Sequence, residues 1–189
     1  MKKIISRFLI IFLISLFMTG CLTTEFKEYR FHINADGSGS GTVKFINIVS
    51  EEDEETDVSD TDFDELINNY IEGESFETDN PFYQVSSKEL FEEDGMLCGK
   101  VEFTFENYKE IGFYRFKDSA KTPVIYYLDD DSEVLIETDG VFYADNKNVP
   151  ISLWEPGTSD FFFKTSVKQD LSDSISLVEH YRLWKMIQE

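Results

Sequence analysis

The sequence predicts an α+β fold, in which a mainly antiparallel sheet of about seven or eight strands carries two amphipathic helices. Several short runs alternate aromatic or β-branched residues with polar ones, which is typical of strands with one wet face. Two longer stretches instead repeat apolar residues at helical spacing. Because consecutive strands are joined by turn residues rather than by helices, we expect antiparallel pairing.

The first predicted element is a hairpin. Residues 27–33, KEYRFHI, and residues 42–49, TVKFINIV, are strand-like runs, and residues 34–41, NADGSGSG, connect them. An Asp-Gly pair between two runs of period two is a strong short-range hairpin signal, and the alternating glycines suit a turn or a bulged loop. The connection is therefore interpreted as a turn.

The same connection has a second interpretation as a cation site. Asn34, Asp36 and Ser38, followed by Gly39, match the first half of a calcium-binding loop, which places oxygen ligands two residues apart before a glycine. The match ends at the twelfth position, where Phe45 stands instead of a glutamate. Strands, not helices, flank the loop. Calcium held by Asn34, Asp36 and Ser38 remains the alternative to a plain turn, and no other cofactor or metal is expected.

An acidic run leads into the first helix. Residues 50–62 are mostly Asp and Glu, which predicts a solvated loop, with binding of cations or of a basic protein as the alternative. Apolar residues then recur at i, i+3, i+4, i+7 and i+8 and form one stripe, which consists of Phe63, Leu66, Ile67, Tyr70 and Ile71. We expect a helix here, capped by Thr61 or Asp62.

The rest of the chain predicts more strands and a final helix. Two strands between Phe82 and Glu106 meet at Glu93-Asp94-Gly95, and Asn107 with Glu110 resembles the start of a short helical turn. The further predicted strands are residues 124–128, 133–137 and 141–144, taken as a meander, and residues 161–167. A second apolar stripe, which predicts a helix starting at Asp173 or Ser174, consists of Leu177, Val178, Tyr181, Trp184 and Ile187.

The N-terminus has the order of parts of a secretory signal peptide. Basic residues come first, an apolar run follows from Phe8 to Met18, and small residues close the segment at Thr19 and Gly20. The run of about eleven residues is too short to span a hydrocarbon core of roughly 30 Å. Residues 1–20 are therefore predicted to be a signal peptide, and residues 21–189 a single extracytoplasmic domain.

The end of this segment, Leu16-Phe17-Met18-Thr19-Gly20-Cys21, resembles the lipobox of bacterial lipoproteins, with Met18 where the family usually has Leu, Val or Ile. The resemblance implies that Cys21 becomes the lipidated first residue of the mature protein. Two or more acyl chains give stable anchoring to a membrane. Because Leu22 follows, and not the Asp that retains some lipoproteins at the inner membrane, the outer membrane is favoured if the cell has one.

Charge and cysteine content limit the partners. The formal net charge is −21, and cleavage after Gly20 would remove three of the 17 basic residues and none of the 38 acidic ones. Nucleic acids need basic patches, so they are not expected as partners. Cys98 has no mate once Cys21 is lipidated, and its strand-like surroundings predict a small buried hydrophobe.

Few residues suggest catalysis. The two histidines, His32 and His180, stand in no G-x-S-x-G, H-E-x-x-H, Walker or C-x-x-C context. Trp154, on a Pro-bounded segment, is either a contact for a ligand such as a sugar or lipid, or a plug at the end of the sheet. The sequence therefore favours a protein that is not an enzyme.

The lipobox, the Asp-Gly-Ser-Gly hairpin and the late segment LWEPGTSDFFF together resemble the LppM-like bacterial lipoproteins. The resemblance implies an α+β extracytoplasmic domain on a lipid anchor that binds a lipid or glycolipid. The acidic run at residues 50–62 is a departure from what this family resemblance implies, because it is not expected in a protein that binds anionic lipids. We therefore expect a lipid-anchored envelope protein, a non-enzymatic binding module for a hydrophobic ligand or a basic protein. The alternatives are a calcium-responsive module and an envelope hydrolase.

Overall fold

The structure is a computed structural model. It describes residues 22–51, 56–116, 121–128, 132–144, 150–167 and 170–188. The predicted signal peptide 1–20, the lipobox cysteine Cys21 and the middle of the acidic run, residues 52–55, lie outside the described residues.

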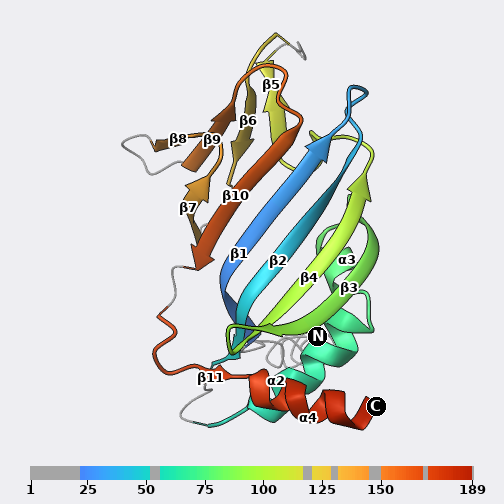
Figure 1. Cartoon of the computed structure of the whole chain (residues 1–189), viewed down its shortest axis with the longest axis vertical. Coiled ribbons are helices and arrows are strands. Elements are labelled where there is room, and N and C mark those ends of the chain that lie inside the picture. The colour runs from blue at the N-terminus through green and yellow to red at the C-terminus, as the bar shows by residue number, and fades with distance from the viewer. Residues whose placement is uncertain are drawn as a thin grey trace, which may run out of the picture.

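The fold is α+β, as the sequence predicts, and its main element is a seven-stranded antiparallel sheet (Figure 1). The strands follow the order β3-β4-β2-β1-β10-β7, and β11 pairs with β2 beyond this path. Their bounds are β1 Leu22–Ile33, β2 Gly39–Ser50, β3 Gln84–Glu93, β4 Met96–Phe105, β7 Glu133–Thr138, β10 Asp160–Val167 and β11 Ile175–Ser176.

A second, four-stranded sheet corrects the predicted meander. It has the order β5-β6-β9-β8, formed by β5 Phe113–Arg115, β6 Val124–Tyr127, β9 Pro150–Trp154 and β8 Val141–Ala144. The prediction that β6, β7 and β8 pair in sequence is wrong, because β7 joins β10 in the large sheet and β9 lies between β6 and β8. Leu135 of β7 is buried in the core of the large sheet, which local sequence cannot indicate.

The two predicted hairpin turns are confirmed. Between β1 and β2 the register runs to Ile33 opposite Gly39, so residues 34–38 form the turn. Between β3 and β4, Glu93 pairs with Met96 and only Asp94 and Gly95 connect them, with φ of 52° and 78°. Two positive φ angles define the tight hairpin turn that Asp-Gly favours.

The first helix is longer than predicted and changes its hydrogen bonding midway. It runs as α2 Ser59–Glu65 and continues as a π-helical turn, η1 Leu66–Ile71, before a short helix, α3 Ser75–Asp79. The predicted acidic loop 50–62 therefore ends before Ser59. Asp57 accepts a hydrogen bond from the Ser59 amide at 2.9 Å, so the predicted cap at Thr61 or Asp62 is wrong.

The C-terminal helix and the segment after β4 also differ from the predicted bounds. Helix α4 is Val178–Gln188 and begins four residues later than Ser174, because Ile175 and Ser176 pair with β2 as β11. The predicted helical turn at residues 107–116 is a turn followed by strand β5. Asn107 still accepts a hydrogen bond from the Lys109 amide at 3.1 Å.

One face of the large sheet carries the core, and two different coverings share it. The second sheet lies over one end and the helices lie at the other (Figure 1). At the first end the buried residues are mostly aromatic, whereas at the second they are mostly aliphatic, among them Leu66, Leu97 and Leu177. Among the described residues, no helix has the length and apolar character needed to cross a bilayer.

Candidate functional site

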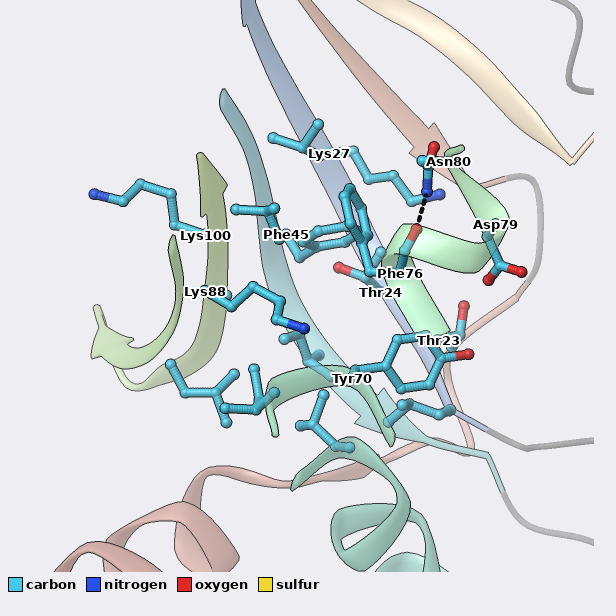
Figure 2. A pocket seen from close by; sticks show the side chains of 18 of the residues that line it. Thr23, Thr24, Lys27, Phe45, Tyr70, Phe76, Asp79, Asn80, Lys88 and Lys100 are labelled. Atoms are coloured by element: carbon cyan, nitrogen blue, oxygen red, sulfur yellow. Dashed lines mark hydrogen bonds between the residues drawn. The ribbon is translucent and has the colours of Figure 1, made fainter. Parts of the chain in front are cut away.

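A large cavity lies between the large sheet and the segment formed by η1 and α3 (Figure 2). Its volume is about 720 Å³, within the range of roughly 300–1,000 Å³ found for small-molecule sites. Strands β1, β2, β3 and β4 form one wall, through apolar residues such as Val43, Phe45 and Val101. Leu66 and Phe76 line the opposite wall.

Both walls of the cavity contain a local backbone irregularity. At the end of η1 the Glu72 backbone amide donates a hydrogen bond to the Ile67 carbonyl, five residues earlier. In an α-helix the acceptor would be four residues earlier, so this turn is wider. On the sheet side, Asn47 has a φ of 58°, and it and Glu25 interrupt the pairing register of β1 and β2. Across this break, the side-chain amide of Asn47 donates a hydrogen bond of 2.8 Å to the Glu25 carboxylate. Beyond it, Leu22 becomes a lining residue of the cavity.

Helix α3 covers the cavity through one aromatic side chain. Phe76, which is 8% exposed, stands edge-on to Phe45 of β2, with ring centres 6.2 Å apart. It also stacks against Tyr83 at 6.2 Å. Because α3 has only five residues, Phe76 is its one buried side chain. The cover over the cavity is therefore thin.

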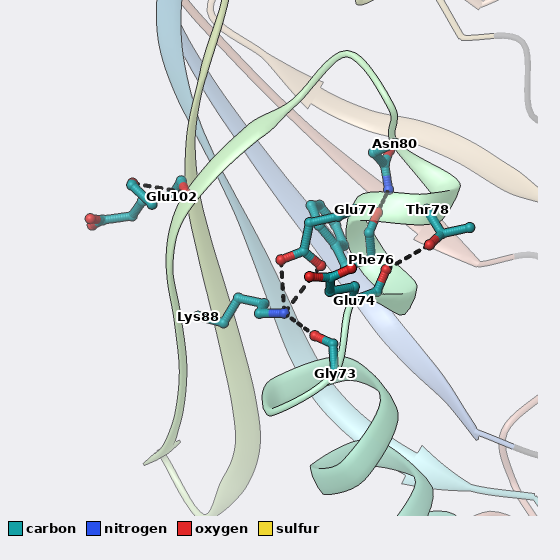
Figure 3. A network of polar contacts seen from close by, with 9 residues as sticks. Gly73, Glu74, Phe76, Glu77, Thr78, Asn80, Lys88 and Glu102 are labelled. Carbon is teal, nitrogen blue, oxygen red and sulfur yellow. Dashed lines mark hydrogen bonds and ion pairs between the residues drawn. The ribbon is translucent and has the colours of Figure 1, made fainter.

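A lysine of the sheet holds this cover in place (Figure 3). The Lys88 ammonium group, on β3, lies 2.9 Å and 3.1 Å from the two carboxylate oxygens of Glu77 on α3. It also donates to the Gly73 carbonyl, at the end of the preceding helical segment. The Lys88 side chain is 12% exposed, and its donors are directed to these three oxygens. We call Lys88, Glu77 and Gly73 the clasp.

Two tyrosines bring phenol groups to the cavity. Tyr83 stacks on Phe103 with ring centres 3.9 Å apart, and burial raises the pKa of Tyr83 to about 12. Burial first, then the carboxylates of Glu65 and Asp79, raise the pKa of Tyr70. Neither phenol oxygen has a hydrogen-bond partner within the described part of the chain. Both phenols are therefore neutral near pH 7 and available to a ligand.

The charged groups around the cavity are unequally compensated. Lys27 pairs with Glu133, which is almost fully buried and also accepts a hydrogen bond from Thr165. Lys100 extends away from the cavity in Figure 2 and pairs with Glu89 and Glu102. Asp79 lines the cavity, but its carboxylate forms no ion pair or hydrogen bond with any described residue.

The residues of the predicted cation loop hydrogen-bond to one another. Asp36 accepts bonds from the Ser38 amide at 3.0 Å and from the Ser38 hydroxyl at 2.7 Å, and these bonds lower the pKa of Asp36. Asn34 donates to the Ser38 hydroxyl at 3.1 Å. The loop thus has the geometry of a turn. In the described ranges, no three His, Cys, Asp or Glu side chains are grouped to hold a metal ion.

Trp154 is a plug, the second of its two interpretations. It is 5% exposed, and its indole nitrogen donates to Asp139 at 2.6 Å. Its ring lies 6.0 Å from that of Phe113 and 5.1 Å from that of Phe161. It does not line the cavity.

Cys98 is fully buried, as predicted, and burial raises the pKa of its thiol.

The two histidines lie away from the large cavity. His32, on the outer face of β1, is 2.8 Å from Asp160 and lines a shallower depression of about 500 Å³. Ser40, on the neighbouring strand β2, pairs with His32 in the register of the sheet. Among His32, Ser40 and Asp160, the side-chain hydrogen bond joins His32 and Asp160. His180 lies 3.1 Å from Asp60 on the helical end of the molecule.

Sequence reasoning missed most of the cavity residues. The sequence predicts Leu66, Tyr70 and Ile71 as core residues, because their helical stripe does not show which members face a space. Asp79 and Tyr83 carry no signal at all, since Asp79 ends and Tyr83 follows a short helix that the sequence does not predict. No family model, no curated protein and no solved structure matches this chain.

Proposed function

We propose that this protein is a lipid-anchored, non-enzymatic envelope protein that binds a hydrophobic ligand in the large cavity. The observation that carries the proposal is the space of about 720 Å³ between β-strands and a thin helical cover. Its lining is mainly apolar, and its two phenols have no protein partner within the described residues. An apolar space with a few unused polar groups is what small-molecule sites have in common.

The position of the N-terminal strand agrees with this proposal. Leu22, the first residue of β1, lines the cavity, and Cys21 of the lipobox-like segment directly precedes it in the sequence. Lipidation of Cys21 would tether the chain to an extracytoplasmic membrane surface one residue from the cavity wall. A ligand leaving that membrane would have a short path. In a cell with two membranes, we place the protein on the outer one.

The proposal is preferred over the two alternatives. In the calcium alternative, Asp36 Oδ1 and the Ser38 hydroxyl would have to exchange their hydrogen bond to one another for a cation. In the hydrolase alternative, the Ser40 hydroxyl would need a base, whereas the described hydrogen bond of His32 goes to Asp160. The cavity needs no rearrangement of this kind.

Ligand binding is tested with the uncharged dye N-phenylnaphthylamine, whose fluorescence rises in apolar surroundings. The protein is used as cells process it, after removal of detergent. Ile71→Trp enlarges a side chain that lines the cavity and should abolish most of the fluorescence increase. Leu183→Trp makes the same type of change on the 57% exposed face of α4 and serves as the matched control. Equal dye binding by both variants would contradict the proposed function.

The anchor is tested in cells with radioactive palmitate. Cys21→Ala should lose the label, whereas Cys98→Ala should keep it, because Cys98 lies in the core. Label retained in the Cys21→Ala protein would refute the anchor but not the cavity.

A further inference from the structure

We infer that the ligand of this cavity is a cationic amphiphile, with a long apolar chain and an ammonium head group. This inference rests on the proposed function, because it names the chemical class of the ligand for the same site. It follows from three features of the described residues: the state of the lysines, the carboxylate of Asp79 and the aromatic lining.

The lysines at the cavity are already neutralised by protein carboxylates. Lys88 forms an ion pair with Glu77 and donates a hydrogen bond to the Gly73 carbonyl, and Lys27 forms an ion pair with Glu133. An anionic head group such as a carboxylate or phosphate would have to displace these partners. Displacing Glu133 would leave its carboxylate uncompensated where it is 2% exposed, which is costly. The third lining lysine, Lys100, is paired with Glu89 and Glu102, so the described lining residues offer no free positive charge to an anion.

A negative charge without a described partner remains. Asp79 lines the cavity, and its field reaches far enough to disfavour ionisation of Tyr70. Figure 2 shows Asp79, Thr23 and the phenol end of Tyr70 on the same side of the cavity. Lys27, Lys88 and Lys100 are each paired with a carboxylate, so among the described lining residues the Asp79 carboxylate is left without a basic partner. The whole chain adds to this field, with its formal net charge of −21.

Aromatic faces near a carboxylate favour an ammonium group in particular. Phe45, Tyr70, Phe76 and Tyr83 all line the cavity. Their ring faces attract a cation, and an ammonium that binds Asp79 would form a charge-assisted hydrogen bond. The phenol oxygens of Tyr70 and Tyr83 can accept further N–H bonds. An uncharged alcohol would use the phenols but gain less from Asp79.

The experiment compares three single-chain probes that differ only in the head group: dodecylamine, dodecanol and laurate. Dodecylamine and laurate are used below their critical micelle concentrations, and dodecanol below its solubility limit, to displace N-phenylnaphthylamine from the protein. We expect the amine to bind at least tenfold more tightly than the alcohol, and laurate to bind most weakly. In the Asp79→Asn protein, the difference between amine and alcohol should fall to less than threefold.

A matched variant separates a local effect from the general negative charge. Asp64→Asn removes the same charge from a position on α2 that is exposed, as Asp79 is, but that does not line the cavity, so the tenfold preference should persist. The inference is overturned if the alcohol binds as tightly as the amine, or if Asp79→Asn and Asp64→Asn have the same effect. Displacement by the alcohol alone would leave the proposed function intact. If neither the dye nor any probe binds, the proposed function fails as well.

Discussion

The two ends of the same sheet face are filled in different ways. Under the second sheet, Phe113 contacts the rings of Phe31, Tyr126 and Phe161 at centre distances of 5.0 to 5.1 Å. Under η1 and α3, by contrast, a space of about 720 Å³ remains. A strand sends every second side chain toward the face it covers, whereas the five-residue helix α3 buries only Phe76. The type of covering element therefore decides which end is solid.

The largest predicted difference comes from removing an aromatic ring at each end. Phe113 is 2% exposed and surrounded by rings, so Phe113→Ala should cost about 3–5 kcal/mol in the free energy of unfolding. Phe45 borders the cavity and has fewer neighbours to lose, so Phe45→Ala should cost only about 1–2 kcal/mol. Urea denaturation measures both. Equal losses would show that the helical end is packed as tightly as the other.

The next largest effect is expected at alkaline pH, from the tyrosine at the border of the two regions. In the folded state burial raises the pKa of Tyr83 to about 12, above its ordinary value of 10.0. The folded state therefore keeps this proton when the unfolded state loses it. The contribution is fully present below about pH 10 and is lost as the pH rises through about 12, by up to roughly 2.7 kcal/mol.

The test compares urea denaturation at about pH 9 and about pH 12. In the Tyr83→Phe protein, this part of the alkaline loss should disappear, because no phenol is left to ionise. Tyr114→Phe changes a tyrosine that is 50% exposed and should keep the loss seen in the unchanged protein. An identical alkaline response of all three proteins would mean that Tyr83 is not shielded from water.

Two glycines on neighbouring strands give a smaller and sharper comparison. A Cβ atom at Gly41 would lie 2.7 Å from the Phe103 ring and 2.9 Å from that of Phe31. Gly41→Ala should therefore cost about 1–3 kcal/mol. At Gly99, the nearest atom is the end of Ile48 at 3.3 Å, and Ile48 borders the cavity and can shift. Gly99→Ala should stay within about 0.5 kcal/mol of the unchanged protein. Thermal or urea denaturation measures both losses of stability. A larger loss in Gly99→Ala than in Gly41→Ala would contradict the prediction.

The smallest predicted effect concerns the clasp over the cavity. Lys88→Met removes the ammonium group and leaves Glu77, which is 30% exposed, able to reach water. Weakening of the cover by about 1 kcal/mol should speed dissociation of bound N-phenylnaphthylamine about fivefold. Lys44→Met breaks an ion pair with Glu93 between strands β2 and β3; neither residue lines the cavity, so the rate should be unchanged. Stopped-flow fluorescence measures the rates, and equal rates would exclude the clasp as a barrier to exchange.

The sequence by itself determined the features that depend on a few neighbouring residues. The Asp94-Gly95 turn follows from two positive φ angles, and the apolar stripes of α2 and α4 follow from helical spacing. Together with the alternating strands, these local signals are enough for the α+β class. They also explain why the turn interpretation of Asn34, Asp36 and Ser38 agrees with the structure, since their bonds span only two to four residues.

Only the tertiary structure decided the pairing of β7, the burial of Trp154 and the cavity. Each depends on contacts between residues far apart in the chain, such as Leu135 opposite Thr165 or Trp154 against Phe113. Alternation shows that a strand has a buried face but does not name its partner. The cavity is harder still to predict. It forms where no side chain fills the space between η1, α3 and the sheet, and no local sequence pattern indicates such a gap in packing.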